Sequence, residues 1–351
     1  MVFVWLFEVT PCNIVDVCVR ANWFKCRKNE KMKLNNKRIG IAVNGQDATE
    51  IVGTIKYLEE IGIHAAWLTT GGAGRDGLTV FAAAAVQTSH ILLGTSIIPT
   101  WPRHPVSVAQ QVRVLEELAP GRFRLGIGPS HRDSMQRLIG TDFIAPLGHL
   151  REYIQILKAL IQEGEVDFDG TYYRAHAQTG TKLSVPVMAS ALRVRSFELC
   201  GEEADGAITW LCPGPYLEQV AVPALQGGAQ RGHREVPPLI AHAPVCVHDN
   251  ADEVRFAVRQ QMGHYPTLPF YAQMLVESGF PEIAQLKSWS DAAIDQVVLS
   301  GNEEQVEARL RGMFAFGAKE LVLSLVMAGD DQARCMERTL NLVSKVASSL
   351  D

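Results

Sequence analysis

In this chain of 351 residues, a histidine follows an apolar run that ends with two closely spaced glycines, Gly126 and Gly128. The run 122–127 leads into Gly128, Pro129, Ser130 and His131. The unperturbed pKa of histidine lies near neutrality, so an imidazole at this place could relay a proton. A hydrogen bond from His131 to a phosphate or to loop backbone is the alternative role.

A second stretch could bind an anion. Ser190, Ala191, Leu192 and Arg193 follow the apolar run 185–190 and open a predicted helix. The first turn of a helix presents unpaired N–H groups and the positive end of the helix dipole. Ser190 to Arg193 are therefore predicted to form a phosphate-binding site, with Arg193 and Arg195 adding positive charge. Ordinary surface arginines are the alternative interpretation.

The segment Gly72-Ala73-Gly74-Arg75-Asp76-Gly77 has the spacing of a dinucleotide-binding fingerprint. That fingerprint also requires an acidic residue about 20 positions further on, to bind the ribose hydroxyls. No Asp or Glu occurs from Leu78 to Leu115. We therefore predict a flexible loop here, with Asp76 as the N-cap of the next helix.

Composition argues against several classes of partner. The chain has 33 Lys and Arg against 38 Asp and Glu, so it lacks the basic excess that nucleic acid binding requires. The apolar stretch at the N-terminus is too short to span a bilayer. The 10 His and 7 Cys form no HExxH, no CxxC and no close ligand set, so no metal site is predicted. Scattered cysteines fit a cytoplasmic protein, and a small molecule is the expected partner.

Short apolar runs alternate with amphipathic stretches along most of the chain. Near-continuous apolar runs are typical of parallel strands that are buried on both faces. Strand followed by helix, eight times, predicts an α/β fold, a closed (β/α)8 TIM barrel. The eight predicted strands are 38–43, 65–69, 91–98, 122–127, 185–190, 206–211, 239–247 and 320–326.

Two connections are longer than an ordinary unit of this fold, namely 129–185 and 250–319. Insertions at the carboxyl ends of barrel strands usually build the active site, so we expect insertions at that face. Asp169-Gly170 predicts the turn of a small hairpin. The barrel domain is expected over 32–351. Residues 1–31 differ in composition and are interpreted as an extension without a fold, either translated ahead of a start at Met32 or forming an N-terminal arm.

Several of these segments occur together in a known family. Gly94 to Thr100 is followed by Arg103-His104-Pro105, a helix, Gly121-Arg122, a strand and Gly126-Ile127-Gly128. With Ala204-Asp205-Gly206 and a closing segment at 316–320, this pattern resembles the luciferase-like monooxygenase superfamily over residues 38–351. Leu125 to His131 and Arg151-Glu152-Tyr153 look most like members that depend on coenzyme F420, a deazaflavin.

The resemblance implies a cofactor site. In this superfamily the third strand ends in a bulge, often with a non-prolyl cis peptide, behind the central ring of a flavin or deazaflavin. The resemblance puts that bulge at Ser96-Ile97, where a plain buried strand is the alternative. It also implies cofactor contacts at Gly126 and Gly128, for which a simple tight turn is the alternative. A phosphate-binding site is implied at Ser190, Ala191, Leu192 and Arg193. Asn44 and Thr70 would face the substrate.

One departure from the family pattern concerns proton transfer. Many F420 enzymes carry Asp-His after the second strand and Glu after the fourth-strand glycines. Here Thr70-Gly71 and His131 stand at these places. His131 is therefore the candidate catalytic residue.

The expected function is hydride transfer between C5 of F420 and a small organic substrate. An FMN-dependent luciferase-like monooxygenase is one alternative. A barrel that binds a cofactor or ligand without catalysis is the other. The sequence leaves open whether the chain forms a homodimer.

Overall fold

The computed structural model describes residues 37–350, so the expected extension 1–31 lies outside the described residues. Eight parallel strands form a closed barrel, because β10 pairs with both β9 and β12 while β12 pairs with β1. This confirms the predicted α/β TIM barrel, and every predicted strand is present within two or three residues. The barrel strands are β1 (Arg38–Ala42), β2 (Ala65–Leu68), β3 (Leu92–Thr95) with its continuation β4 (Ile98–Pro99), β5 (Phe123–Gly128), β8 (Val187–Ser190), β9 (Ala207–Trp210), β10 (Leu239–Val247) and β12 (Glu320–Leu325).

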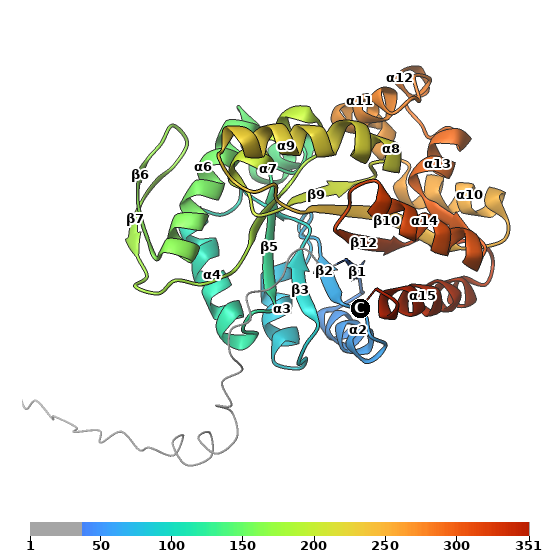
Figure 1. Cartoon of the computed structure of the whole chain (residues 1–351), viewed down its shortest axis with the longest axis horizontal. Coiled ribbons are helices and arrows are strands. Elements are labelled where there is room, and N and C mark those ends of the chain that lie inside the picture. Colours follow the sequence, from blue (N-terminus) through green and yellow to red (C-terminus); the bar gives the residue numbers. More distant parts are fainter. Residues whose placement is uncertain (1–36, 351) are drawn as a thin grey trace, which may run out of the picture. The chain divides into compact units, whose positions relative to one another are not determined.

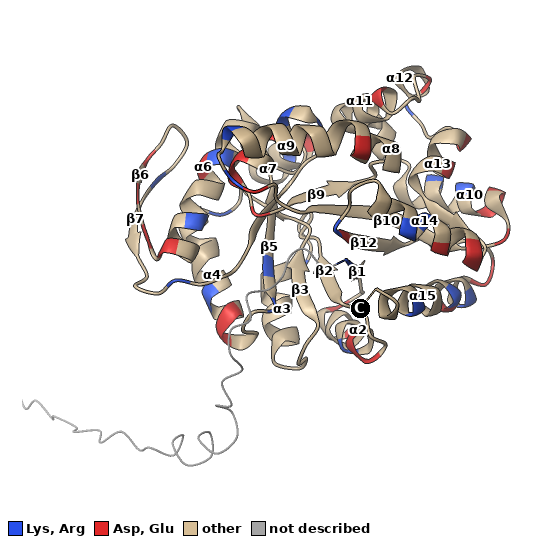
Figure 2. Cartoon of the chain, in the orientation of Figure 1, with Lys and Arg blue, Asp and Glu red and all other residues tan. Residues whose placement is uncertain are grey.

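Helices surround the strands, and charged residues gather on those helices and on loops (Figures 1 and 2). The helices that return the chain from strand to strand are α2 (Ala48–Glu60), α3 (Gly77–Ala85), α4 (Pro105–Leu118), α6 (Pro146–Lys158), α7 (Val194–Glu203), α9 (Val222–Arg231), α14 (Glu303–Ala315) and α15 (Gln332–Ser348). The additional elements are α5 (Arg132–Ile139), η1 (Ala159–Glu163), β6 (Glu165–Asp169), β7 (Arg174–Gln178), α8 (Gly214–Tyr216), η2 (Leu217–Ala221), α10 (Ala251–Met262), η3 (Tyr265–Thr267), α11 (Pro269–Glu277), α12 (Ile283–Leu286), α13 (Asp291–Val297) and β11 (Leu299–Gly301).

Polar side chains cap the first turns of two helices, α3 and α4. The Asp76 carboxylate accepts a hydrogen bond of 2.9 Å from the Thr79 N–H, which confirms its predicted role as the N-cap of α3. His104 accepts from the Val106 N–H at 3.3 Å, with Pro105 as the first residue of α4. Each cap satisfies an N–H that has no partner inside its helix.

The inside of the barrel has a small apolar core of its own, formed by Ala65, Trp67, Met188, Ile208, Ile240 and Val322. The Trp67 side chain on β2 lies against the backbone of both flanking strands, β1 and β3. A Cβ atom at Gly40 or at Gly94 would lie 2.7 Å or 2.6 Å from the Trp67 side chain. Only glycine leaves room for the indole on the two flanking strands.

A buried ion pair closes the amino-terminal end of the barrel. Arg124 from the start of β5 reaches Glu320 at the start of β12, with Nη2 and Oε1 2.8 Å apart. The Trp67 indole N–H donates to the same carboxylate at 3.0 Å. Both charged side chains are buried. Active sites of this fold lie at the opposite end, at the carboxyl ends of the strands.

The expected hairpin is formed by β6 and β7, and its turn begins at Gly170, whose N–H donates to the Tyr173 carbonyl at 2.9 Å. It follows α6 along the chain instead of following β5 directly. Glu152 on α6 accepts hydrogen bonds from the backbone N–H groups of Thr171, Tyr172 and Tyr173. The turn is thereby held against α6, and the Tyr173 ring lies 5.4 Å from that of His104.

Candidate active site

A ring of uncharged residues lies above the inner apolar core, at the carboxyl ends of the strands. Side chains alternate along a strand, so residues two positions beyond a core residue face the same interior. Ile208, Ile240 and Val322 of the inner core are followed at this spacing by Trp210, His242 and Ser324. The same spacing on all eight strands defines what we call the upper ring: Asn44, Thr69, Ser96, Gly128, Ser190, Trp210, His242 and Ser324.

The third strand is interrupted at the expected place. β3 ends at Thr95 and β4 resumes at Ile98, and the peptide bond between Ser96 and Ile97 is cis. Two residues that follow β2 hold the Ser96-Ile97 link through two hydrogen bonds. The Thr69 hydroxyl donates to the Ser96 carbonyl at 2.6 Å, and the Thr70 N–H donates to the Ile97 carbonyl at 3.1 Å.

Three of the predicted cofactor residues converge beside that link. A Cβ atom at Gly128 would lie 2.2 Å from the Ser190 Oγ and 3.2 Å from the Ile97 Cδ1. The Ser96 hydroxyl is buried and has no hydrogen-bond partner within residues 37–350. A buried hydroxyl without a partner is costly unless a ligand or water satisfies it. Bare backbone at Gly128 and the free hydroxyl of Ser96 fit a flat polar ring such as a flavin or deazaflavin.

Gly126 has a packing explanation. A Cβ at this position would lie 1.9 Å from the Thr95 carbonyl oxygen. The Thr95 hydroxyl also bridges the Gly126 carbonyl and N–H, at 2.7 and 2.8 Å. The close approach of β3 and β5 alone requires glycine here, and cofactor contact at Gly126 stays a prediction.

Of the two residues expected to face the substrate, Asn44 lines a depression of about 140 Å3 and Thr70 does not, whereas the neighbouring Thr69 does; contact of either expected residue with a substrate stays a prediction. The Thr70 hydroxyl accepts a hydrogen bond of 3.0 Å from the Gly77 N–H, which turns it toward the start of α3. Thr69 lies in the depression with Asn44, Gly71 and Arg75. The one-residue difference follows from strand alternation, which aims Thr69 and Thr70 in opposite directions.

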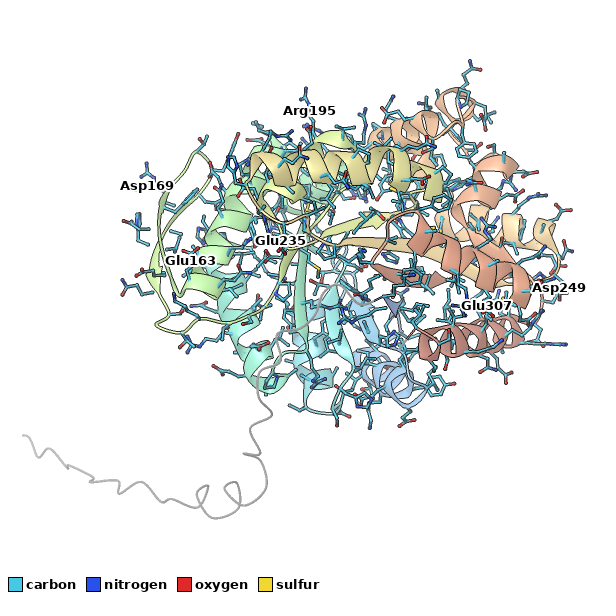
Figure 3. All side chains as sticks on the ribbon, viewed as in Figure 1. Glu163, Asp169, Arg195, Glu235, Asp249 and Glu307 are labelled. Carbon is cyan, nitrogen blue, oxygen red and sulfur yellow. The ribbon has the colours of Figure 1, made fainter. Side chains whose placement is uncertain are left out.

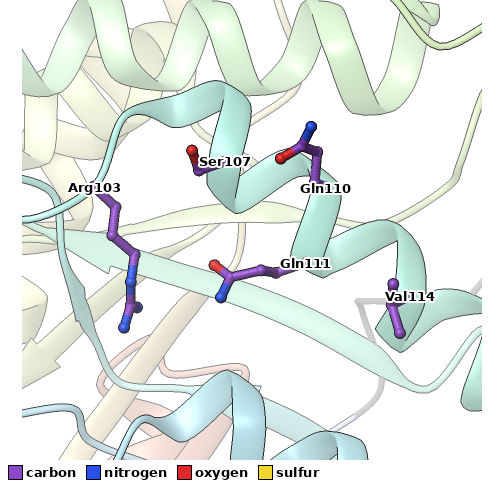
Figure 4. Close-up of a pocket in the computed structure, with 5 residues that line it drawn as sticks. All are labelled: Arg103, Ser107, Gln110, Gln111 and Val114. Atoms are coloured by element: carbon purple, nitrogen blue, oxygen red, sulfur yellow. The ribbon is translucent and has the colours of Figure 1, made fainter.

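A second depression lies elsewhere. It has a volume of about 420 Å3 and is lined by Arg103 and four residues of α4, namely Ser107, Gln110, Gln111 and Val114 (Figure 4). It contains none of the predicted site residues.

Three backbone N–H groups of the expected phosphate site, those of Ala191, Leu192 and Arg193, already have partners, and phosphate binding there stays a prediction. The N–H groups of Leu192 and Arg193 both donate to the Ser196 hydroxyl, at 3.0 and 3.1 Å. The Ala191 N–H donates to the Ile208 carbonyl at 2.8 Å. The N–H groups next along α7, of Val194 and Arg195, are therefore the ones that could meet an anion.

Two arginines near this helix start differ in their surroundings. The Arg193 guanidinium pairs with Glu277 at 2.6 Å. Arg195 is exposed and projects outward (Figure 3). A phosphate at the start of α7 would therefore compete with Glu277 for Arg193.

His131 lies among aromatic residues at the barrel mouth. It precedes α5 without capping it, and its ring lies 5.8 Å from that of Tyr271. Burial, and then the proximity of His264, lower the pKa of His131. The imidazole is therefore neutral at neutral pH and could accept a proton, but its catalytic role stays a prediction.

The sequence interpretation missed a pair of polar residues across β10 and β12. The His242 Nε2 and the Ser324 Oγ lie 2.8 Å apart. Burial lowers the pKa of His242 to about 3, so this ring is uncharged. The Trp210 ring packs against it, with centroids 4.2 Å apart. Counting in twos from Ile240 along the run 239–247 would have placed His242 inside the barrel.

Within residues 37–350, no group of three or more His, Cys, Asp or Glu side chains could hold a metal ion. No helix of the same part of the chain is long and apolar enough to cross a membrane.

Known proteins of similar sequence include two informative relatives. An uncharacterised protein of Mycobacterium tuberculosis is 27% identical over 306 residues, which are 78% of this chain and 89% of that protein. An F420-dependent glucose-6-phosphate dehydrogenase of Beutenbergia cavernae is 34% identical over 196 residues, which are 54% of this chain and 58% of that enzyme.

Solved structures share the fold. An F420-dependent secondary alcohol dehydrogenase in complex with an F420-acetone adduct superposes with a TM-score of 0.73 at 18% identity, covering 90% of this chain and 99% of that one. The oxygenating constituent of 3,6-diketocamphane monooxygenase of Pseudomonas putida, in complex with FMN, gives 0.66 at 16% identity, covering 90% and 98%.

The family assignment rests on most of the chain. The model of the luciferase-like monooxygenase family matches residues 32–348. That range includes the closed barrel, the interrupted third strand and the upper ring. The chain is thus an oxidoreductase of the luciferase-like monooxygenase family.

Proposed function

We propose that this protein transfers a hydride between C5 of coenzyme F420 and a small organic substrate. The observation that carries the proposal is the convergence of Ser96, Ile97, Gly128 and Ser190 at the interrupted third strand, inside the mouth of the barrel. The names of the Beutenbergia relative and of the secondary alcohol dehydrogenase support F420 as the cofactor.

Each residue has a distinct part in the proposal. Ile97 and the backbone of Gly128 support the flat deazaflavin ring, and the Ser96 hydroxyl forms a hydrogen bond with the polar edge of that ring. The first turn of α7, with Arg193 released from Glu277, binds the phosphate. Asn44 and Thr69 contact the substrate, and His131 takes or returns its proton. The bound deazaflavin supplies the hydride chemistry, while the protein orients the reactants and excludes water.

Two other functions are compatible with this site. The FMN complex of the Pseudomonas oxygenase favours an FMN-dependent monooxygenase. Thr70-Gly71 in place of the family's Asp-His favours a barrel that binds its ligand without turnover.

Titration of the full chain with F420 and with FMN, followed by cofactor fluorescence, tests the proposal. We expect F420 to bind more tightly than FMN. Ser96→Ala should weaken F420 binding, while Ser107→Ala on the outer face of α4 should not change it. Tighter binding of FMN would favour the monooxygenase. F420 binding without oxidation of any alcohol or reduction of any ketone in a broad panel would favour the non-catalytic barrel.

A further inference from the structure

We infer that Ser324, held in position by His242, hydrogen-bonds an oxygen atom of an uncharged ketone or alcohol substrate. This inference rests on the proposed hydride transfer and names its substrate class. Ser324 lies near the end of β12, two residues beyond Val322 of the inner core, and its side chain is half-buried. It therefore stands between the buried His242 and the open mouth of the barrel.

The tautomer of His242 sets which way the Ser324 hydroxyl points. The His242 Nε2 lies 2.8 Å from the Ser324 Oγ. In the tautomer with its proton on Nε2, the imidazole donates to Ser324, and the serine O–H is left free to donate outward. A substrate oxygen facing the mouth would receive that hydrogen bond. Ser324 would then be a substrate-binding residue and His242 a positioning residue.

His242 is not suited to act as the proton acceptor itself. Burial lowers its pKa to about 3. A ring with this pKa is a weak base and stays neutral through the physiological range. The pair therefore offers a neutral hydrogen-bond donor that polarises a carbonyl, and proton transfer is left to another group such as His131.

The surrounding residues favour an uncharged substrate. None of the eight residues of the upper ring carries a formal charge. Arg75, near Asn44, is engaged with the backbone carbonyls of Gly45 and Gln46. A phosphorylated sugar entering this ring would lose hydration without gaining a cation, and that loss is expensive in a low-dielectric site.

Aromatic residues on the same side provide an apolar wall. The Trp210 ring lies 4.2 Å from the His242 ring and 5.8 Å from the Tyr265 ring, which in turn lies 4.9 Å from that of Tyr271. Flat apolar surfaces of this kind bind hydrocarbon by contact and exclude water. A donor at Ser324 beside this wall suits a molecule with one carbonyl or hydroxyl oxygen on a hydrocarbon body.

The test is isotope-edited infrared spectroscopy of cyclohexanone labelled with carbon-13 at its carbonyl, bound to the full chain with and without F420. A hydrogen bond lowers the carbonyl stretching frequency, and we expect this shift in the wild-type protein. Ser324→Ala should abolish the shift and weaken binding about tenfold, the usual worth of one hydrogen bond. Ser324→Thr keeps the hydroxyl and should retain the shift.

Variants at His242 separate positioning from packing. His242→Gln retains an N–H donor and should keep part of the shift, whereas His242→Phe should lose it although cyclohexanone still binds against the aromatic wall. Ser107→Ala serves as the control. An unshifted carbonyl in the wild-type protein, an unchanged shift in Ser324→Ala, no binding of cyclohexanone, or tighter binding of glucose 6-phosphate would each overturn the inference. Failure of F420 to bind, measured separately, would overturn the proposed function while the cofactor-free spectra still test Ser324.

Discussion

The backbone of Gly128 on β5 lies directly against the hydroxyl of Ser190 on the neighbouring strand β8. A Cβ atom at Gly128 would lie 2.2 Å from the Ser190 Oγ and 3.1 Å from its Cβ. Non-bonded heavy atoms do not approach to 2.2 Å, so any side chain at 128 must displace the Ser190 hydroxyl. Both residues lie in the upper ring, where the cofactor ring is proposed to bind.

We therefore expect Gly128→Ala to weaken F420 binding by tenfold or more while the barrel stays folded, because only the mouth is disturbed. Adding Ser190→Gly should restore part of the affinity, since it removes two of the three nearest atoms that the new methyl group meets and leaves only the Ile97 Cδ1 at 3.2 Å. Fluorescence titration measures the affinity, and circular dichroism checks the fold. Gly53→Ala is the control, because no atom lies within 4 Å of its added Cβ. Unchanged affinity in Gly128→Ala would mean that the cofactor does not approach this backbone.

A second prediction concerns the competition for Arg193. Its guanidinium pairs with Glu277 on α11, and a phosphate at the start of α7 must draw it away. Glu277→Gln should therefore raise the affinity for F420 severalfold, and Arg193→Ala should lower it. Both effects should shrink as salt is added, because exposed charges are screened over about 10 Å at 0.1 M.

Arg231→Ala is the matched control for this pair. Arg231 is likewise paired with carboxylates, Glu198 and Glu202, but it is exposed and lies on α9. Equal F420 affinities of all three variants and the wild-type protein at low ionic strength would place the phosphate elsewhere.

The barrel could be predicted from the sequence because each of its strands is an apolar run long enough to identify. The position of the interrupted link at Ser96 and Ile97 came from the family resemblance, since nothing in the run 91–98 alone distinguishes it from a regular strand. The alternation of side chains along a strand predicts more than the apolar runs alone. It turns the side chains of Thr69 and Thr70 in opposite directions and places His242 inside the barrel.

Contacts that form only on folding could not be predicted. His242 and Ser324 meet across 82 residues of chain, on strands whose register the sequence does not specify. The hydroxyl of Ser196 accepts hydrogen bonds from two backbone N–H groups that the sequence predicts as phosphate donors. A serine three residues into a helix is a common capping partner, but the sequence does not say which side chain takes which donor.

Stability should fall as the pH is lowered below about 6.5, the ordinary pKa of histidine. Burial lowers the pKa of His149 to about 4 and that of His242 to about 3. As the pH falls, these histidines take up protons first in the unfolded chain, so protonation favours unfolding. We expect the urea midpoint to decrease from pH 7.5 to pH 5.5.

His149→Gln should flatten this dependence, because it removes one buried histidine that stays neutral in the folded state. His176→Gln is the control at an exposed site. Bonding to Asp167 raises the pKa of His176, so its contribution has the opposite sign and its removal should not flatten the curve. A midpoint that is constant or rises toward pH 5.5 in the wild-type protein would contradict the prediction.

The last prediction concerns the ion pair at the amino-terminal end of the barrel. Arg124 is fully buried, and Glu320 is its charged partner as well as the acceptor for the Trp67 indole. Glu320→Gln keeps an acceptor for Trp67 but leaves the guanidinium without a carboxylate. Removing one partner of a buried pair typically costs about 3–5 kcal/mol, so we expect a loss of this size in the free energy of unfolding, measured with urea.

Replacing both charges, in Arg124→Met with Glu320→Gln, should recover most of the loss, because no buried charge then lacks its partner. The control is Glu307→Gln on α14 (Figure 3), which breaks the surface contacts of Glu307 with Arg311 and Lys345 and should cost less than about 1 kcal/mol. If the double variant were no more stable than Glu320→Gln alone, the destabilisation would come from the altered packing around Trp67 and not from the unpaired charge.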